Sequence, residues 1–207
     1  EAGWRDLTGS ATNPMGRDEH AMAYDAARGK VVLFGGWAGA MAQDTWEWDG
    51  MTRTWTNVTP PGAKPAGRTN HAMAYDAANG KVVLFGGLPV GAIPLQDTWE
   101  WDGAARTWTE VTPAGAKPSA RYVHAMAYDS RRAKTVFFGG YDGTSYPQDT
   151  WEWDGASRTW TDVTPSGTKP AGRDGTAMTY DDGRGKVLLF GGRTGVASFL
   201  QDTWEWD

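Results

Sequence analysis

The 207-residue sequence contains no cysteine, which excludes disulfides, thiolate metal ligands and thiol nucleophiles. It has no basic block and a net charge of −5, which argues against nucleic acid and anionic membranes as partners. Its longest run free of charged and polar side chains, about residues 31–42, is shorter than the roughly 18 residues that span a bilayer. No signal peptide stands at its start, and no segment has helical periodicity. These absences predict an all-β protein without membrane insertion.

The hexapeptide Asp-Thr-Trp-Glu-Trp-Asp occurs four times in the chain. Its polar and aromatic residues alternate with the period of a β-strand, so both tryptophans of each copy share one face. A strand of this kind needs a neighbour to bury two indoles, and four copies at near-equal spacing therefore indicate a repeat protein. The copies cover residues 44–49, 97–102, 149–154 and 202–207.

Two further sets of equivalent residues define the repeat length, and successive members of each set are 51, 53 and 52 residues apart. They are Arg17, Arg68, Arg121 and Arg173, and Trp4, Trp55, Trp108 and Trp160. A period near 50 is typical of propeller repeats. Within the second repeat, strands are predicted around 55–59, 71–76, 81–85 and 97–102, joined by turns rich in Gly, Pro and Asn. Four antiparallel strands make one propeller blade, so residues 1–207 are predicted to form one domain of four four-stranded blades.

The pattern resembles the kelch repeat, in which an apolar strand ends in a Gly-Gly doublet, followed by an aromatic residue and, seven residues later, a tryptophan. The doublets are Gly35-Gly36, Gly86-Gly87, Gly139-Gly140 and Gly191-Gly192, and the aromatic pairs are Trp48 with Trp55, Trp101 with Trp108, and Trp153 with Trp160. The resemblance covers the whole chain and implies a kelch-type β-propeller. The chain departs from kelch in having Trp at the usual Tyr position and four repeats where six or seven are common.

The two ends of the sequence predict how the ring closes. Residues 4–8 match the outer strand at 55–59, and the fourth repeat lacks that strand. We therefore expect the N-terminal strand to complete the C-terminal blade and Trp4 to latch the ring, so that Trp4→Ala is damaging. The same pairing could come from a second chain in a two-chain, eight-bladed ring. The entropy cost of association, about 4–15 kcal/mol, favours the closed monomer.

The repeated arginines precede the inner strands, and a ring of guanidiniums at the channel mouth would attract an anion. The alternative is that Arg17, Arg68, Arg121 and Arg173 pair with carboxylates such as Asp44 and Asp97. Three residues on lie His20, His71 and His124, with Thr176 in the fourth repeat. We interpret these as hydrogen-bonded channel histidines, because zinc ligands would need a second-shell carboxylate pattern that is missing here. Recurring Glu and Arg residues, such as Glu47 with Arg53, predict ion pairs across the outer hairpins.

The repeats differ mainly in two sets of loops, one between the Arg and His positions and one after the Gly-Gly doublet. Strand alternation places both sets on one face of the disc, and loops on a rigid scaffold commonly carry recognition. The candidate ligand-binding residues there are Trp37, Tyr122, Tyr141 and Tyr146. The repeated tryptophans are instead predicted to pack in the core.

The predicted function is a non-catalytic module that binds a glycan, a peptide or a protein on this loop face, without metal or cofactor. Galactose oxidases of kelch type use a tyrosine crosslinked to cysteine beside copper, and this chain lacks cysteine. Two alternatives stay open, namely a hydrolase or lyase acting on an acidic sugar at the arginine ring, and a structural or designed repeat without ligand. Resemblance to near-uniform repeats of bacterial surface proteins implies an extracellular or cell-surface location.

Overall fold

The computed structural model describes residues 3–8 and 12–207. These residues form 17 β-strands and no helix, as the alternating pattern predicts. The strands are β1 (Ala21–Asp25), β2 (Lys30–Phe34), β3 (Thr45–Asp49), β4 (Thr54–Asn57), β5 (Arg68–Thr69), β6 (Ala72–Asp76), β7 (Lys81–Phe85), β8 (Leu88–Pro89), β9 (Thr98–Asp102), β10 (Thr107–Glu110), β11 (Ala125–Asp129), β12 (Lys134–Phe138), β13 (Thr150–Asp154), β14 (Thr159–Asp162), β15 (Ala177–Asp181), β16 (Lys186–Phe190) and β17 (Thr203–Trp206).

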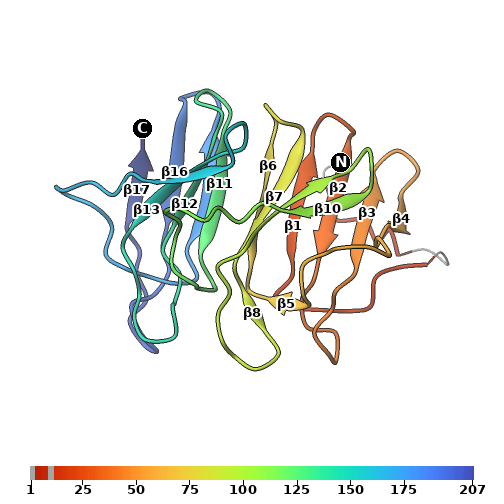
Figure 1. The fold of residues 1–207 in the computed structure, drawn as a ribbon, viewed down its shortest axis with the longest axis horizontal. Helices are drawn as coiled ribbons and strands as arrows, with labels where there is room; N and C mark the ends of the chain where they lie inside the picture. The colour runs from red at the N-terminus through yellow and green to blue at the C-terminus, as the bar shows by residue number, and fades with distance from the viewer. Residues whose placement is uncertain (1–2, 9–11) are drawn as a thin grey trace.

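The strands form the four blades of a kelch-type β-propeller, which confirms the predicted fold class. Blade 1 has the order β1-β2-β3-β4, blade 2 the order β6-β7-β9-β10, and blade 3 the order β11-β12-β13-β14. Within the described residues, blade 4 consists of three strands in the order β15-β16-β17. Figure 1 shows blade 1 at one end of the long axis and blade 4 at the other, with blades 2 and 3 between them. No helix that could cross a membrane occurs in the part of the chain described.

Strand register follows from the residue pattern in each hairpin. In blade 2, Tyr75 lies opposite Val82, Val82 opposite Trp101, and Trp101 opposite Trp108, so one row of large side chains runs across the sheet. A lysine at the start of the second strand forms an ion pair with the last aspartate of the Trp strand, as Lys81 does with Asp102. The outer hairpin turns through Arg106 at a φ of 54°, a left-handed conformation.

Each blade has two different faces, and this difference determines how blades stack. We call the face that points toward the next blade in the chain the forward face, and the opposite one the backward face. The forward face carries small inner residues and a Phe, and the backward face carries a Met, a Tyr and the tryptophans. The forward face of blade 1, with Ala23, Val32 and Phe34, packs on the backward face of blade 2, with Met73 and Trp101. The same forward-to-backward contact joins blade 2 to blade 3 and blade 3 to blade 4. The predicted core role of the repeated tryptophans is therefore correct at these junctions.

The contact between blade 4 and blade 1 differs from the other three junctions. Inner strands pack closely in the series β1, β6, β11 and β15, but β15 and β1 have no comparable packing. Met22 on the backward face of blade 1 is instead 52% accessible and Phe190 on the forward face of blade 4 is 53% accessible, whereas Leu33 and Trp46 on the blade 1 face stay buried. The propeller therefore has an open seam between its last and first blades.

The predicted closure by the N-terminal strand is wrong. Residues 3–8 form no strand, Trp4 is fully exposed, and the outer edge of β17 pairs with no described residue. The physical reason is the open seam, because a strand that continues into blade 1 cannot also reach β17 when those two blades lie apart. Trp4 consequently has no latching role within one chain.

Candidate binding face

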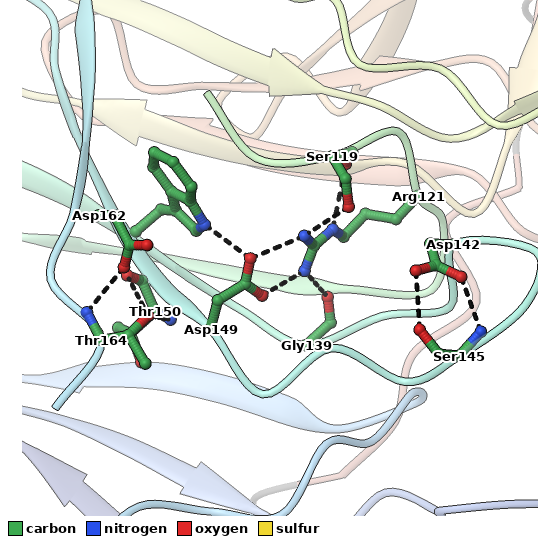
Figure 2. Close-up of polar contacts among 10 residues, drawn as sticks. Ser119, Arg121, Gly139, Asp142, Ser145, Asp149, Thr150, Asp162 and Thr164 are labelled. Carbon is green, nitrogen blue, oxygen red and sulfur yellow. Dashed lines mark hydrogen bonds and ion pairs between the residues drawn. The ribbon is translucent and has the colours of Figure 1, made fainter. Parts of the chain in front are cut away.

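Each of the four repeated arginines forms an ion pair with the aspartate that opens its own blade's Trp strand. Figure 2 shows the example of Arg121, whose Nη1 and Nη2 donate to the two Asp149 carboxylate oxygens at 2.5 and 2.8 Å. Arg121 Nη1 also donates to the Gly139 carbonyl at 3.1 Å, and Nη2 donates to Ser119 Oγ at 2.8 Å. The matching pairs are Arg17 with Asp44, Arg68 with Asp97, and Arg173 with Asp202.

These arginines are buried, so their donors are directed into the blade. Arg68, Arg121 and Arg173 are at most 1% accessible. Burial raises the cost of ionising Asp149, but the hydrogen bonds and the charge of Arg121 outweigh it and hold the pKa of that carboxyl below its usual value. Trp151 Nε1 donates to the same carboxylate at 2.8 Å. The geometry favours the structural alternative for Arg17, Arg68, Arg121 and Arg173, which close the Gly-Gly loop onto the Trp strand.

The three histidines lie in an axial depression of about 210 Å³, together with Glu19, Asn70, Val123, Gly175 and Thr176. Two of the rings pack on phenylalanine, with centroid distances of 5.7 Å for Phe34–His71 and 5.5 Å for Phe85–His124. Neither ring nitrogen of His71 or His124 has a described protein partner within hydrogen-bonding distance, and His20 Nδ1 also has none. Backbone groups of Phe34 and Phe85 act against the lowering of the pKa of His71 and His124, so the expectation of hydrogen-bonded histidines stays a prediction. Among the described residues no group of three His, Asp or Glu could hold a metal.

A chain of backbone hydrogen bonds crosses the blades around this depression. Asn70 N donates to Glu19 O at 2.9 Å, Val123 N to Asn70 O at 2.8 Å, and Gly175 N to Val123 O at 3.0 Å. All four residues have a positive φ between 53° and 63°. This left-handed conformation is strained for Val123, and the regular inter-blade bonds hold it in place.

The two variable loop sets pair with each other, which confirms that they share one face. The bridges join Asp18 to Trp37, Tyr122 to Tyr141, and Asp174 to Arg193, and in blade 2 the short strands β5 and β8 make the equivalent pair. In each blade, a residue just before the position of His20, His71, His124 or Thr176 therefore lies beside the first residue after the Gly-Gly doublet. The face is built by the backbone, while its chemistry varies from blade to blade.

Three tyrosines of blade 3 form a cluster on this face. The Tyr122 and Tyr141 ring centroids lie 5.8 Å apart and edge-on, and those of Tyr141 and Tyr146 lie 4.9 Å apart. Asp142 fixes the loop that carries them by accepting hydrogen bonds from Ser145 N at 2.7 Å and Ser145 Oγ at 2.8 Å (Figure 2). Burial and the neighbouring Tyr141 raise the pKa of Tyr122, which keeps its hydroxyl protonated.

Blade 4 places an ion pair close to the tyrosines. Arg193 Nε donates to Asp174 Oδ1 at 2.8 Å, and both residues influence the pKa of the Tyr122 hydroxyl. Asp174 is buried and Arg193 is exposed, so the guanidinium is presented to solvent. Both positions were identified as variable from the sequence, but their pairing was not, because it depends on the bridge between the two loops. Trp37 lies on blade 1, is 47% accessible, and forms no such cluster with the aromatic residues that the structure describes.

The prediction that Glu and Arg of the same outer hairpin form ion pairs is wrong, because the pairs join neighbouring blades. Arg158 Nη2 lies 2.9 Å from Glu100 Oε2, and Arg106 Nη2 lies 3.9 Å from Glu47 Oε2. In both cases the arginine reaches the glutamate of the preceding blade. Alternation explains this, because the glutamate lies on the forward face, which points toward the next blade in the chain.

Four blades, the Gly-Gly loops and the paired variable loops define a propeller whose loop face is a candidate recognition surface. The model of the KLHDC2/KLHL20/DRC7 Kelch-repeats domain matches residues 1–192. The chain therefore belongs to the kelch-repeat family, whose members are commonly protein-interaction scaffolds.

Curated relatives agree with this family. Serine/threonine-protein phosphatase BSL2 of Arabidopsis thaliana is 31% identical over 184 residues, which cover 82% of this chain and 18% of that protein. Rab9 effector protein with kelch motifs of Xenopus laevis is 28% identical over 208 residues, covering 96% of this chain and 55% of that protein. Mei4-dependent protein 6 of Schizosaccharomyces pombe is 26% identical, covering 90% and 29%. The chain spans at most about half the length of these relatives.

Proposed function

We propose that this protein is a non-catalytic interaction module that binds a protein ligand through the loops of blades 3 and 4. The observation that carries the proposal is the cluster of Tyr122, Tyr141 and Tyr146 beside the exposed guanidinium of Arg193. Tyrosine and arginine are the side chains enriched where protein interfaces concentrate their binding energy. The Asp142 hydrogen bonds order the loop in advance, which lowers the entropy cost of binding.

The arrangement of polar groups supports binding over catalysis. The four repeated arginines donate their hydrogen bonds to aspartates of their own blades, so few guanidinium donors are available to bind an acidic sugar at the channel. One relative is named as an effector of Rab9, and effectors act by binding, which is consistent with an interaction role for the propeller.

The test begins with a display library of extended peptides and a glycan array, both probed with the unaltered chain. The strongest peptide found is then measured against the double variant Tyr122→Ala/Tyr141→Ala. Loss of two central aromatic contacts is expected to weaken binding at least about tenfold. Leu88→Ala, at the matching position of blade 2, is the control and should bind like the unaltered chain.

Three results would overturn the proposal. One is peptide binding that is unaffected by the double variant while Leu88→Ala or Trp37→Ala abolishes it, because recognition would then lie on blades 1 and 2. Another is recovery of a chemically altered ligand, which would show turnover. The third is selective capture of glycans with no peptide bound, which would replace the protein ligand by a carbohydrate.

A further inference from the structure

The open seam exposes one backward face and one forward face, the two kinds of face that pack together at the internal junctions. The backward face of blade 1 presents Met22, Tyr24 and Trp55, and the forward face of blade 4 presents Ala177 and Phe190. At every internal junction a forward face of this composition packs on a backward face of this composition. We propose that a second copy of this chain docks at the seam, forward face to backward face, so that two chains form one eight-bladed ring.

Backbone hydrogen bonds join neighbouring blades at every internal junction, and the equivalent donors and acceptors at the seam face no neighbouring blade. Gly36 N donates to Arg68 O at 2.9 Å, Gly87 N to Arg121 O at 3.0 Å, and Gly140 N to Arg173 O at 2.8 Å. The same rule pairs Gly192 N of one copy with Arg17 O of the other. The axial chain that runs from Glu19 to Gly175 would likewise continue from Gly175 O to Glu19 N of the second copy. Docking completes both series with no new kind of contact.

The side chains follow the same rule. Trp108 Nε1 donates to Thr45 Oγ1 and Trp160 Nε1 to Thr98 Oγ1, each at 2.9 Å across a junction. The seam leaves Trp55 and Thr203 as the next such pair. Phe190 corresponds to Phe34 and Phe85, which pack edge-on against the histidine of the following blade, so its partner would be His20 of the second copy.

Charge complementarity is also present at the seam. Arg106 and Arg158 each reach the glutamate of the preceding blade, and the next residues in this series are Arg53 and Glu205. Arg53 has no carboxylate within ion-pair distance among the described residues. Glu205 pairs only with Arg184 of its own blade, as Glu47 pairs with Arg28, and its second oxygen is available to a partner. The seam therefore matches a positive residue with a negative one.

The N-terminal segment borders the backward face of blade 1, which is the face on which the outer strand of a preceding blade would pack. Leu7 and Thr8 line a cavity of about 540 Å³ together with Met22, Trp48 and Trp55 on the backward face of blade 1. Leu7 is equivalent to Val58, which follows the outer strand of blade 1 and is buried against blade 2. In the two-chain ring residues 4–8 would pair with the open edge of β17 of the second copy, which would supply the fourth strand of that blade.

Blade number selects two chains. Four blades that leave a seam open turn by less than the roughly 90° each that four-bladed closure requires, and propellers have about four to eight blades. Two copies give eight blades, the upper end of this range, and three copies would exceed it. The two seams are then identical and related by a twofold axis, so the assembly closes and stops at two chains.

The first test measures the mass of the 207-residue chain by analytical ultracentrifugation at micromolar concentration. We expect a species at twice the chain mass of 22.5 kDa. Phe190→Ser should leave the 22.5 kDa species, with its β-sheet spectrum intact, because this Phe is exposed in the single chain. Tyr141→Ala, on the loop face, is the control and should not change the mass.

A mixing experiment distinguishes the two-chain ring from closure within one chain. Arg53→Glu places two carboxylates at each seam, and Glu205→Arg places two guanidiniums there, so each variant alone should associate at least about tenfold more weakly. When the two variants are mixed, both seams carry a complementary pair and the doubled mass should return. A 22.5 kDa species under all conditions, a mixture that stays dissociated, or an open series of larger species would overturn the proposal.

Discussion

The central and terminal blades of this propeller have nearly the same sequence and very different exposure. Met73 and Met126 in blades 2 and 3 are 8% accessible, whereas Met22 at the same strand position in blade 1 is 52% accessible. Phe85 in blade 2 is fully buried, whereas its counterpart Phe190 in blade 4 is 53% accessible. The residue types and the hairpins are the same, so the difference comes from the neighbouring blade. Burial in a repeat protein is thus a property of the junction between repeats.

The two terminal blades are exposed on opposite faces. Blade 1 exposes Met22 and Tyr24 of its backward face, and blade 4 exposes Ala177 and Phe190 of its forward face. Each terminal blade therefore retains one junction, while each central blade has two. Because stability in repeat proteins is approximately a sum of repeat and junction energies, we expect the terminal blades to open first.

The largest expected effect contrasts two phenylalanines that differ only in blade. Phe85→Ala removes a fully buried ring that contacts His124, Phe137 and Trp160, and should lower the free energy of unfolding by about 3–5 kcal/mol. Phe190→Ala removes a ring that is half exposed, and should cost less than about 1 kcal/mol. Urea unfolding of both variants at concentrations below association measures the difference. Equal losses would contradict the open seam.

A smaller effect contrasts the central and terminal histidines. Burial, reinforced by the charge of Arg121, lowers the pKa of His124 to about 3, and burial beside Arg68 lowers that of His71. His20 is less buried, and its pKa is lowered by burial and Arg17. Below about pH 6.5 these histidines bind protons in the unfolded chain but not in the folded chain. The free energy of unfolding should therefore fall toward acid by about 1.4 kcal/mol per pH unit for each such histidine.

The measurement compares urea unfolding of the unaltered chain, His124→Gln and His20→Gln between pH 7.5 and pH 4. Carboxylates titrate in all three proteins, so the difference in slope reports the histidine alone. His124→Gln should flatten the loss of stability between pH 6 and pH 4 more than His20→Gln does. Identical slopes for the three proteins would show that His124 is accessible to protons in the folded state.

Much of the fold could be predicted from the sequence because it is encoded locally. Alternation in the Trp strand, the Asn-Gly and Asp-Gly turns and the Gly-Gly doublets each specify one strand or turn, and together they specify a blade. The pairing of Arg68 with Asp97 was among the stated alternatives because both residues recur with the repeat. The loop face followed in the same way, since strand direction determines which loops emerge together.

The features that were missed depend on relations between blades. Glu47 and Arg53 lie opposite in sequence pattern, but the glutamate faces the next blade, and no single repeat contains that information. The match between residues 4–8 and the outer strand is real at the level of pattern, yet pairing requires β17 and blade 1 to be neighbours in space. The turn angle from blade to blade, which decides this, results from the packing of many side chains.

The most direct test of the account is oxidation of the four equivalent methionines by hydrogen peroxide, read peptide by peptide with mass spectrometry. In dilute protein, Met22 should oxidise much faster than Met73 and Met126, and Met178 should lie closer to the buried pair. At concentrations where the mass doubles, Met22 should become protected while the others do not change. Protection of Met22 to the level of Met73 at the lowest concentration would contradict an open seam.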